Sequence, residues 1–418
     1  MQTLDQLRRG DLDGVSHLKL SENLSIFPQE IYRLSETLEV LDLSFNALSS
    51  LPSDMSRFKK LKIAFFSNNL FTEVPPVFKE CKELYMLGFK ANKIERFGED
   101  ILPLSVSWLI LTDNKLPSLP QSMGKLDKLQ KFAVAGNKLQ SLPSEMKNCE
   151  NLELIRLSAN ELNEIPLWLL ELPRLSWLAF SGNPCAKVEG LSLAEMAYDD
   201  LEMKELLGEG ASGEIYKAYS ASLDEDIAFK LFKGAVTSDG YAKDEMNAYM
   251  STGEHKNLIK VIAKLEGDDR LGLILELIPK NYENLGLPPS LQTCTRDTFK
   301  EDQEFSPKTI MTLAKDMASV AQHLHAKGLM HGDFYAHNIL INEDDKSYLG
   351  DFGAASFYKE NEEAYERVEV RAYGCLLEDL LNLCSDTKDE QYLSLKALSS
   401  RCINEDTSKR PLFKEISF

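Results

Sequence analysis

Short apolar strand patterns recur along the first half of the chain. Each has an L-x-L-like form and leads into an Asn, as in residues 41–46 (LDLSFN) and 155–160 (IRLSAN). The Asn residues follow one another every 22 or 23 positions: Asn23, Asn46, Asn69, Asn92, Asn114, Asn137, Asn160 and Asn183. A fixed period of this length is typical of stacked repeats, each of which buries its apolar face against the next. The pattern predicts one short parallel strand per repeat, with the leucine positions facing inward.

A Pro follows most of these Asn residues by six positions, as in Leu119-Pro120 and Leu142-Pro143, and fixes the backbone of the return turn. Together, the strand pattern, the Asn and the Pro resemble eight leucine-rich repeats. The Asn side chains can hydrogen bond backbone groups where the chain leaves each strand, which predicts a buried ladder. Residues 1–14 and 184–198 are expected to cap the two ends of the array.

The outward strand positions of these repeats carry a large share of apolar and aromatic side chains. The residues expected to bind a partner on this concave face are Phe65, Met86, Trp108, Ile110, Arg156 and Trp177. Soluble proteins rarely leave such a patch bare, and aromatic anchors on a rigid surface favour a protein or peptide partner. The partner is either a separate protein or the chain's own second half. The alternative is that some of these side chains pack on neighbouring repeats.

The repeat period stops near residue 195, and a glycine-rich segment follows. Gly208, Gly210 and Gly213 form a G-x-G-x-x-G pattern between two strand-like runs, not in front of a helix. That context argues against a dinucleotide fold and predicts a hairpin loop that covers phosphates.

Lys230 lies inside the next strand-like apolar run, where burying its charge is costly without a partner. Phosphate oxygens and the carboxylate of Glu245, in a helical segment, would supply one. The alternative is a surface pair with Glu225 or Asp226.

Two carboxylates and an amide then gather in a short interval. Residues 331–338 (HGDFYAHN) contain Asp333 and Asn338, and residues 351–353 (DFG) contain Asp351. Carboxylate and amide oxygens suit Mg²⁺, and a carboxylate can orient a reacting hydroxyl. The alternative for Asp333 is a loop carboxylate that caps nearby N–H groups. His331 is expected to be a hydrogen-bonded core residue, and His323, His325 and His337 are expected to be helix-surface and loop residues.

The order of these motifs resembles a two-lobed protein kinase domain. Residues 369–374 (EVRAYG) and Arg410-Pro411 resemble two further family motifs, and residues 275–277 occupy the place of the hinge that meets the adenine. With the repeats, the chain is similar to intracellular leucine-rich-repeat protein kinases of the bacterial kind. The fold class implied is an α/β repeat solenoid (residues 1–198) followed by an α+β kinase-like domain (residues 199–418). That domain would have an N-lobe over residues 199–280 and a reduced C-lobe over residues 281–418.

The resemblance implies a role for each matching residue. Lys230 would contact the α- and β-phosphates of ATP, held by Glu245; Asn338 and Asp351 would bind Mg²⁺; and Asp333 would take or orient the acceptor proton. The nucleotide-binding residues implied are Gly208, Glu209, Gly210, Gly213, Ile215, Ala228, Lys230, Glu245, Glu276 and Leu277. The activity implied is Mg·ATP-dependent phosphorylation of serine or threonine, with the repeats as a docking or regulatory module.

Three features depart from the family pattern. Gly332 stands where the family has an Arg that binds a phosphorylated loop, and Tyr335 stands where serine/threonine kinases have a Lys. The stretch from Gly353 to Glu369 is short and lacks an A-P-E motif. Two alternatives therefore stay open: a small-molecule phosphotransferase with the repeats as sensor, and a non-enzymatic scaffold.

Charge and cysteine content narrow the partners and the compartment. The net charge is −19 and the pI about 4.9, which disfavours nucleic acid and anionic membranes as partners. No apolar run is long enough to span a membrane, and the start of the chain does not resemble a signal peptide. The seven Cys residues are scattered without a C-x-x-C pair, which favours a reduced, cytoplasmic protein.

Overall fold

The computed structural model describes residues 2–187, 194–210, 213–233, 237, 239–266, 271–358 and 363–418. Contacts divide the chain into two compact units, Met1–Leu172 and Pro173–Phe418. Parts of three predicted features lie outside the described residues: the cap at 188–193, the tip of the glycine loop at 211–212, and residues 359–362 of the segment after the D-F-G motif. The domain boundary after residue 198 stays a prediction.

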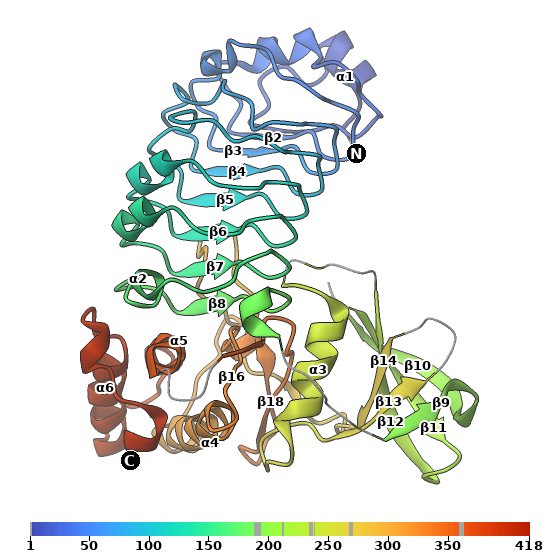
Figure 1. The fold of residues 1–418 in the computed structure, drawn as a ribbon, viewed down its shortest axis with the longest axis vertical. Coiled ribbons are helices and arrows are strands. Elements are labelled where there is room, and N and C mark those ends of the chain that lie inside the picture. The colour runs from blue at the N-terminus through green and yellow to red at the C-terminus, as the bar shows by residue number, and fades with distance from the viewer. Residues whose placement is uncertain are drawn as a thin grey trace. The chain divides into compact units, whose positions relative to one another are not determined.

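The first unit contains seven three-residue strands, one per repeat. They are β1 (His17–Lys19), β2 (Val40–Asp42), β3 (Ile63–Phe65), β4 (Met86–Gly88), β5 (Trp108–Ile110), β6 (Lys131–Ala133) and β7 (Leu154–Arg156). From β1 to β7, each pairs with the next in parallel and without a register shift (Figure 1). The middle residue of every strand is buried, as the alternation of the L-x-L pattern predicts.

The return segments of this unit are short helical turns. They comprise α1 (Leu4–Arg9), η1 (Gln29–Leu34), η2 (Met55–Arg57), η3 (Gln121–Lys125), η4 (Ser144–Asn148) and α2 (Leu167–Leu170). Thr3 and Gln6 form a capping box at the start of α1, and the helix ends at Gly10, whose φ of 88° suits glycine. A Pro stands directly before η1, η3, η4 and α2.

The Asn ladder joins each repeat of the first unit to the one before it. The amide oxygen of Asn137 accepts from the Leu116 N–H at 2.9 Å, and its amide nitrogen donates to the Leu111 and Val134 carbonyls at 2.9 and 3.0 Å. The same pattern recurs at Asn46, Asn69, Asn92, Asn114 and Asn160. Because each side chain pairs backbone groups of two repeats, the ladder fixes the stacking distance as well as satisfying buried polar groups.

Some outward strand positions pack on neighbouring repeats. Phe65 lies over Gly88 of the next repeat, where a Cβ atom would come within 2.8 Å of its ring. The ammonium of Lys131 lies 4.2 Å from the ring centroid of Trp108, a cation–π contact. Met86 and Arg156 are buried, while Ile110 is partly exposed. Contacts between neighbouring repeats therefore bury part of the apolar surface that the composition of the concave face suggests would be exposed.

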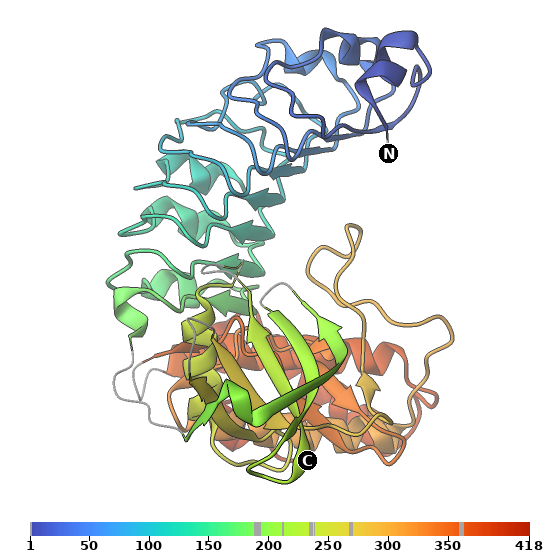
Figure 2. The same ribbon diagram turned by 90° about the vertical axis from the view of Figure 1, so that its right-hand side faces the viewer.

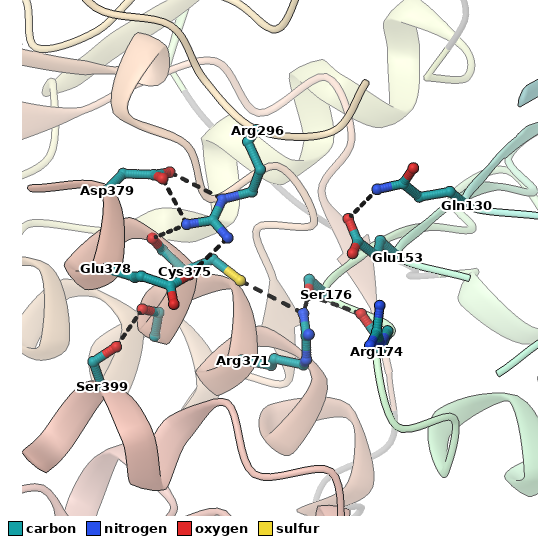
Figure 3. A network of polar contacts seen from close by, with 11 residues as sticks. Gln130, Glu153, Arg174, Ser176, Arg296, Arg371, Cys375, Glu378, Asp379 and Ser399 are labelled. Carbon is teal, nitrogen blue, oxygen red and sulfur yellow. Dashed lines mark hydrogen bonds and ion pairs between the residues drawn. The ribbon is translucent and has the colours of Figure 1, made fainter. Parts of the chain in front are cut away.

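The second unit begins with a strand that continues the repeat pattern. This strand, β8 (Trp177–Ala179), lies against the long helix α5 (Glu363–Asn382). Arg371 of α5 donates to the Ser176 hydroxyl at 2.5 Å (Figure 3), and Arg410 donates to the Pro173 carbonyl at 2.7 Å. By its contacts, β8 belongs with the C-terminal half of the chain.

A six-stranded sheet follows, in the order β10-β11-β12-β14-β13-β9. Its strands are β9 (Glu195–Ala197), β10 (Leu201–Glu209), β11 (Gly213–Ser220), β12 (Glu225–Phe232), β13 (Val261–Glu266) and β14 (Gly272–Glu276), with helix α3 (Ala242–Thr252) between β12 and β13. All neighbours pair antiparallel except β9, which pairs parallel with β13. Residues 195–197 were expected to cap the repeats; that expectation is wrong for them, because their backbone completes the edge of this sheet.

The remainder of the second unit is mainly helical. Helices α4 (Pro307–His325), α5 and α6 (Glu390–Cys402) are drawn in orange and red in Figure 1 and in Figure 2. Among the described residues they are accompanied by five short strands: β15 (Glu283–Asn284), β16 (Leu329–Met330), β17 (Ile339–Ile341), β18 (Ser347–Leu349) and β19 (Ser356–Phe357). Residues 369–374, which resemble a family motif, lie inside α5, which is already helical from Glu363. Arg296 ties the segment before α4 to α5, through a bidentate pair with Asp379 (Figure 3). Across the described residues, no helix is both long and apolar enough to cross a membrane.

The ladder yields a stability prediction. Asn137→Ala would leave the Leu116 N–H buried without its partner, while the Leu111 carbonyl keeps the hydrogen bond from Asn114. We therefore expect it to lower the free energy of unfolding by about 1–3 kcal/mol. Urea unfolding followed by circular dichroism measures this. Asn148→Ala, at an exposed site in η4, is the matched control and should change little. Equal effects of the two substitutions would contradict a structural role for the ladder.

Candidate functional site

A buried ion pair links the sheet of the second unit to α3. Lys230 of β12 and Glu245 of α3 are 5% and 2% exposed, and their side chains are in direct contact. This is the partner that the sequence favours; Asp226 instead pairs with Lys204 and Lys217. Burial lowers the pKa of Lys230, but the nearby Tyr249, Glu245 and Asp351 outweigh it and raise the pKa above its ordinary value. The amine therefore stays charged at neutral pH.

Tyr249 connects this pair to the D-F-G segment. Its hydroxyl accepts from the Asp351 N–H at 3.0 Å, and its ring centroid lies 4.7 Å from that of Phe352. Sequence reasoning missed this residue. The available signal was spacing, because residues four apart on a helix share a face and Tyr249 follows Glu245 by four positions.

Asp351 and Phe352 of the D-F-G segment have different environments, one exposed and one buried. Asp351 has a left-handed φ of 53°, and its carboxylate is exposed and accepts from the Gly353 N–H at 3.2 Å. Phe352 is buried, with its ring centroid 4.9 Å from that of His331. The packing of Phe352 thus anchors the segment, and the charge of Asp351 acts on Lys230.

The catalytic-loop segment is held by hydrogen bonds on both sides of Asp333. His331 is fully buried; its Nε2 donates to the Gly350 carbonyl at 2.9 Å, and its Nδ1 accepts from the Asp333 N–H at 3.3 Å. The amide nitrogen of Asn338 donates to the Asp333 carbonyl at 2.9 Å. His331 is therefore the hydrogen-bonded core residue that the sequence predicts. The side chain of Asp333 is partly exposed.

Glu369 is a fully buried carboxylate beneath this loop. It accepts from the Gly332 N–H at 2.7 Å, from the His331 N–H at 3.2 Å, and from His325 at 2.7 Å. Burial would raise the pKa of Glu369, but the hydrogen bond and charge of His325 outweigh it and lower the pKa. The expectation that His325 lies at the surface is wrong, because it is buried as the partner of this carboxylate.

The charges of three acidic side chains act on His337. It lies 2.6 Å from a carboxylate oxygen of Asp297, a pair that sequence reasoning missed. Burial lowers the pKa of His337, but the hydrogen bond to Asp297 and the charges of Asp297, Asp333 and Asp351 raise it overall. Asp333 and Asp351, 18 positions apart in sequence, therefore act on the same ring.

The glycine-rich segment forms the predicted hairpin between β10 and β11, closed by a hydrogen bond from the Gly210 N–H to the Gly213 carbonyl at 2.9 Å. A Cβ atom at Gly208 or Gly210 would meet nothing within 4 Å, whereas one at Gly213 would lie 2.4 Å from the Leu231 carbonyl oxygen. Gly213 is therefore required by the close approach of β12, and only Gly208 and Gly210 leave open backbone.

The other predicted nucleotide-binding residues line the same sheet. Ile215 pairs with Lys230 across β11 and β12, and Ala228 pairs with Leu275 across β12 and β14. Glu276 ends β14, and both its N–H and its carboxylate bond the backbone of Lys260. Leu277 follows, half-buried, and Glu209 is exposed and pairs with Lys233 at 2.5 Å.

The oxygen donors fit a cation that also has phosphate ligands. Because the Asn338 amide nitrogen is engaged by Asp333, the amide oxygen is the atom it can present, and the Asp351 carboxylate is exposed. Among the described residues, no cluster of three or more His, Cys, Asp or Glu could hold a metal by itself. A carboxylate and an amide oxygen are ligand types that Mg²⁺ takes together with water and substrate phosphates.

Comparison with protein families agrees with this geometry. Residues 201–375 match the model of the protein kinase domain, and residues 37–58 match that of the Leucine Rich Repeat. The chain thus carries a protein kinase domain preceded by leucine-rich repeat sequence.

Curated relatives match part of the chain. Fibroblast growth factor receptor 1 of Xenopus laevis is 32% identical over 174 residues, covering 38% of this chain and 21% of the relative. Cyclin-dependent kinase 11.2 of Caenorhabditis elegans is 24% identical over 168 residues, covering 40% of this chain and 24% of the relative. The chain therefore spans about a quarter or less of the length of these relatives.

The buried Glu369 predicts a pH-dependent stability difference. Glu369→Gln removes one acceptor oxygen, so we expect the second unit to lose about 1–3 kcal/mol of unfolding free energy at neutral pH. Because the folded-state pKa is lowered, the carboxylate's contribution is complete above its ordinary value of 4.5 and is lost as the pH falls through the folded value. The difference between wild type and variant, measured by urea unfolding, should shrink below pH 4.5. A difference independent of pH would contradict the role of the charge.

The glycine loop gives a paired prediction. Gly213→Ala should lower stability by about 1–3 kcal/mol, because its Cβ would overlap the Leu231 carbonyl and force the strands apart. Gly208→Ala, where the Cβ meets open space, is the control and should leave the melting temperature nearly unchanged. The prediction fails if both variants melt alike.

Proposed function

We propose that the chain is a Mg·ATP-dependent protein kinase. The observation that carries the proposal is the buried Lys230–Glu245 pair with the exposed Asp351 carboxylate acting on it. A buried amine that its neighbours keep charged, with the charge of an exposed carboxylate acting on it, suits the phosphates of a nucleotide and their metal ion. A purely structural ion pair would not need the third charge.

In this proposal each residue has one task. Lys230 binds the α- and β-phosphates, Glu245 orients Lys230, and the oxygens of Asn338 and Asp351 hold Mg²⁺. When bound there, the metal ion would supply positive charge beside the phosphates. Asp333 orients the acceptor hydroxyl and takes its proton as the oxygen bonds to the γ-phosphorus and the bond to ADP breaks. The backbone at Gly208 and Gly210 is open for phosphate contacts.

We propose serine or threonine of a protein as the acceptor, in the cytoplasm, with the outward face of the repeats recognising a substrate or regulator. A second candidate, transfer to a small-molecule hydroxyl, is favoured by one observation. Tyr335, in the position of the family's Lys, is buried and contributes no charge near Asp333.

Incubation of the purified full chain with labelled Mg·ATP and a cell lysate tests the proposal. Label on proteins should appear with wild type, and Asp333→Asn or Lys230→Met should reduce it by about 10²- to 10⁴-fold. Lys396→Met, at an exposed site on α6, is the control and should retain activity. Phosphoamino-acid analysis should find phosphoserine or phosphothreonine. Label only on small molecules would favour the second candidate, and nucleotide binding without turnover would mean a scaffold.

A further inference from the structure

Gly332 is a position where three segments of the second unit meet. Its φ is 74°, and a Cβ atom there would lie 2.6 Å from the carbonyl oxygens of both Leu178 and Ala354. No side chain fits such a site without displacing backbone. The departure from the family's Arg therefore has a physical reason: the backbone of β8 occupies the space that the Arg would need.

Trp177, next to Leu178 in β8, covers the adjoining part of the catalytic loop. Its ring stacks on that of Tyr335, with centroids 4.4 Å apart and planes 6° from parallel, and its indole N–H donates to the Phe334 carbonyl at 3.4 Å. Trp177 and Tyr335 are 1% and 4% exposed. The sequence left two partners open for Trp177, a separate protein and the chain's own second half. In the structure, Trp177 contacts the second half. The contact fixes the peptide between Phe334 and Tyr335, the second one after Asp333.

The same stretch also touches the elements on either side of the site. The Phe180 N–H donates to the Ser356 hydroxyl at 2.9 Å, just after the D-F-G segment. A Cβ atom at Gly182 would lie 2.8 Å from side-chain atoms of Tyr241 and Asp244, at the start of α3. Since α3 carries Glu245, residues 173–182 contact the catalytic loop, the segment after D-F-G and the helix of the Lys230 ion pair.

We propose that residues 173–182 are a permanent positioning element of the kinase site, and that Trp177 positions Asp333 through the Phe334 peptide. The proposal rests on the proposed function. A displaceable inhibitory plug would need a site that is complete without it. Here the backbone of β8 occupies the space that a side chain at residue 332 would need. The segment between Gly353 and Glu369 is too short to replace the contacts that β8 makes.

Two substitutions in the full chain separate the contributions of Trp177. Trp177→Ala removes both the stacking and the hydrogen bond, while Trp177→Phe keeps an aromatic face and loses only the donor. We expect Trp177→Ala to lower kcat by about 10- to 100-fold, with the KM for ATP and the Kd for ADP within about threefold of wild type. Trp177→Phe should fall between that variant and wild type. Trp168→Ala, on α2 in the first unit, is the matched control and should behave as wild type.

Hydrogen exchange followed by mass spectrometry provides a readout independent of turnover. Peptides covering residues 331–338 should exchange faster in Trp177→Ala, while those covering the sheet of β10 to β14 should not change. An increase in kcat would identify an inhibitory plug and overturn the proposal, as would unchanged kcat and exchange. Loss of ADP binding together with faster exchange throughout the second unit, in both Trp177 variants, would indicate a merely structural residue. If wild type transfers no phosphate, the proposed function fails, and the exchange data alone decide whether Trp177 holds the loop.

Discussion

The catalytic loop can lie where it does only because residue 332 has no side chain. The carbonyl oxygens of Leu178 and Ala354 lie 2.6 Å from where a Cβ atom of residue 332 would be. The Glu369 carboxylate accepts hydrogen bonds from the Gly332 and His331 N–H groups. The loop is thus held between a repeat strand and helix α5 by backbone groups. Such contacts tolerate little displacement, because buried backbone donors and acceptors must keep their partners.

Buried charge provides the second level of organisation. Glu369 is stabilised by His325 and two backbone donors, and Glu245 by Lys230. A buried pair adds little net stability compared with apolar packing, but removing one partner leaves an uncompensated charge at high cost. Each carboxylate therefore has one low-energy arrangement. That arrangement fixes the catalytic loop in one case and the distance between α3 and β12 in the other.

Sequence patterns predicted the features that depend on local spacing. The repeat strands, the Asn ladder and the hairpin at Gly210 all follow from short-range periodicity or glycine placement. The Lys230–Glu245 pair was also predictable, because the cost of burying a lysine requires a partner. The burial of His325 and the choice of Tyr335 as the neighbour of Trp177 were not, since both depend on side chains more than 40 positions away that no local period marks.

The repeat period in the sequence and the contacts in the structure assign residues 173–183 to different parts of the chain, and this difference has a physical cause. The Asn period runs through Asn183, so this stretch has the sequence of a repeat. Its contacts place it instead in the compact unit Pro173–Phe418. A repeat strand must bury its inward face whatever its outward face does, which explains why the leucine pattern persists. The outward face is free to vary, and at Trp177 it has become a surface for Tyr335. One strand can therefore satisfy both requirements because successive side chains of a strand point to opposite faces.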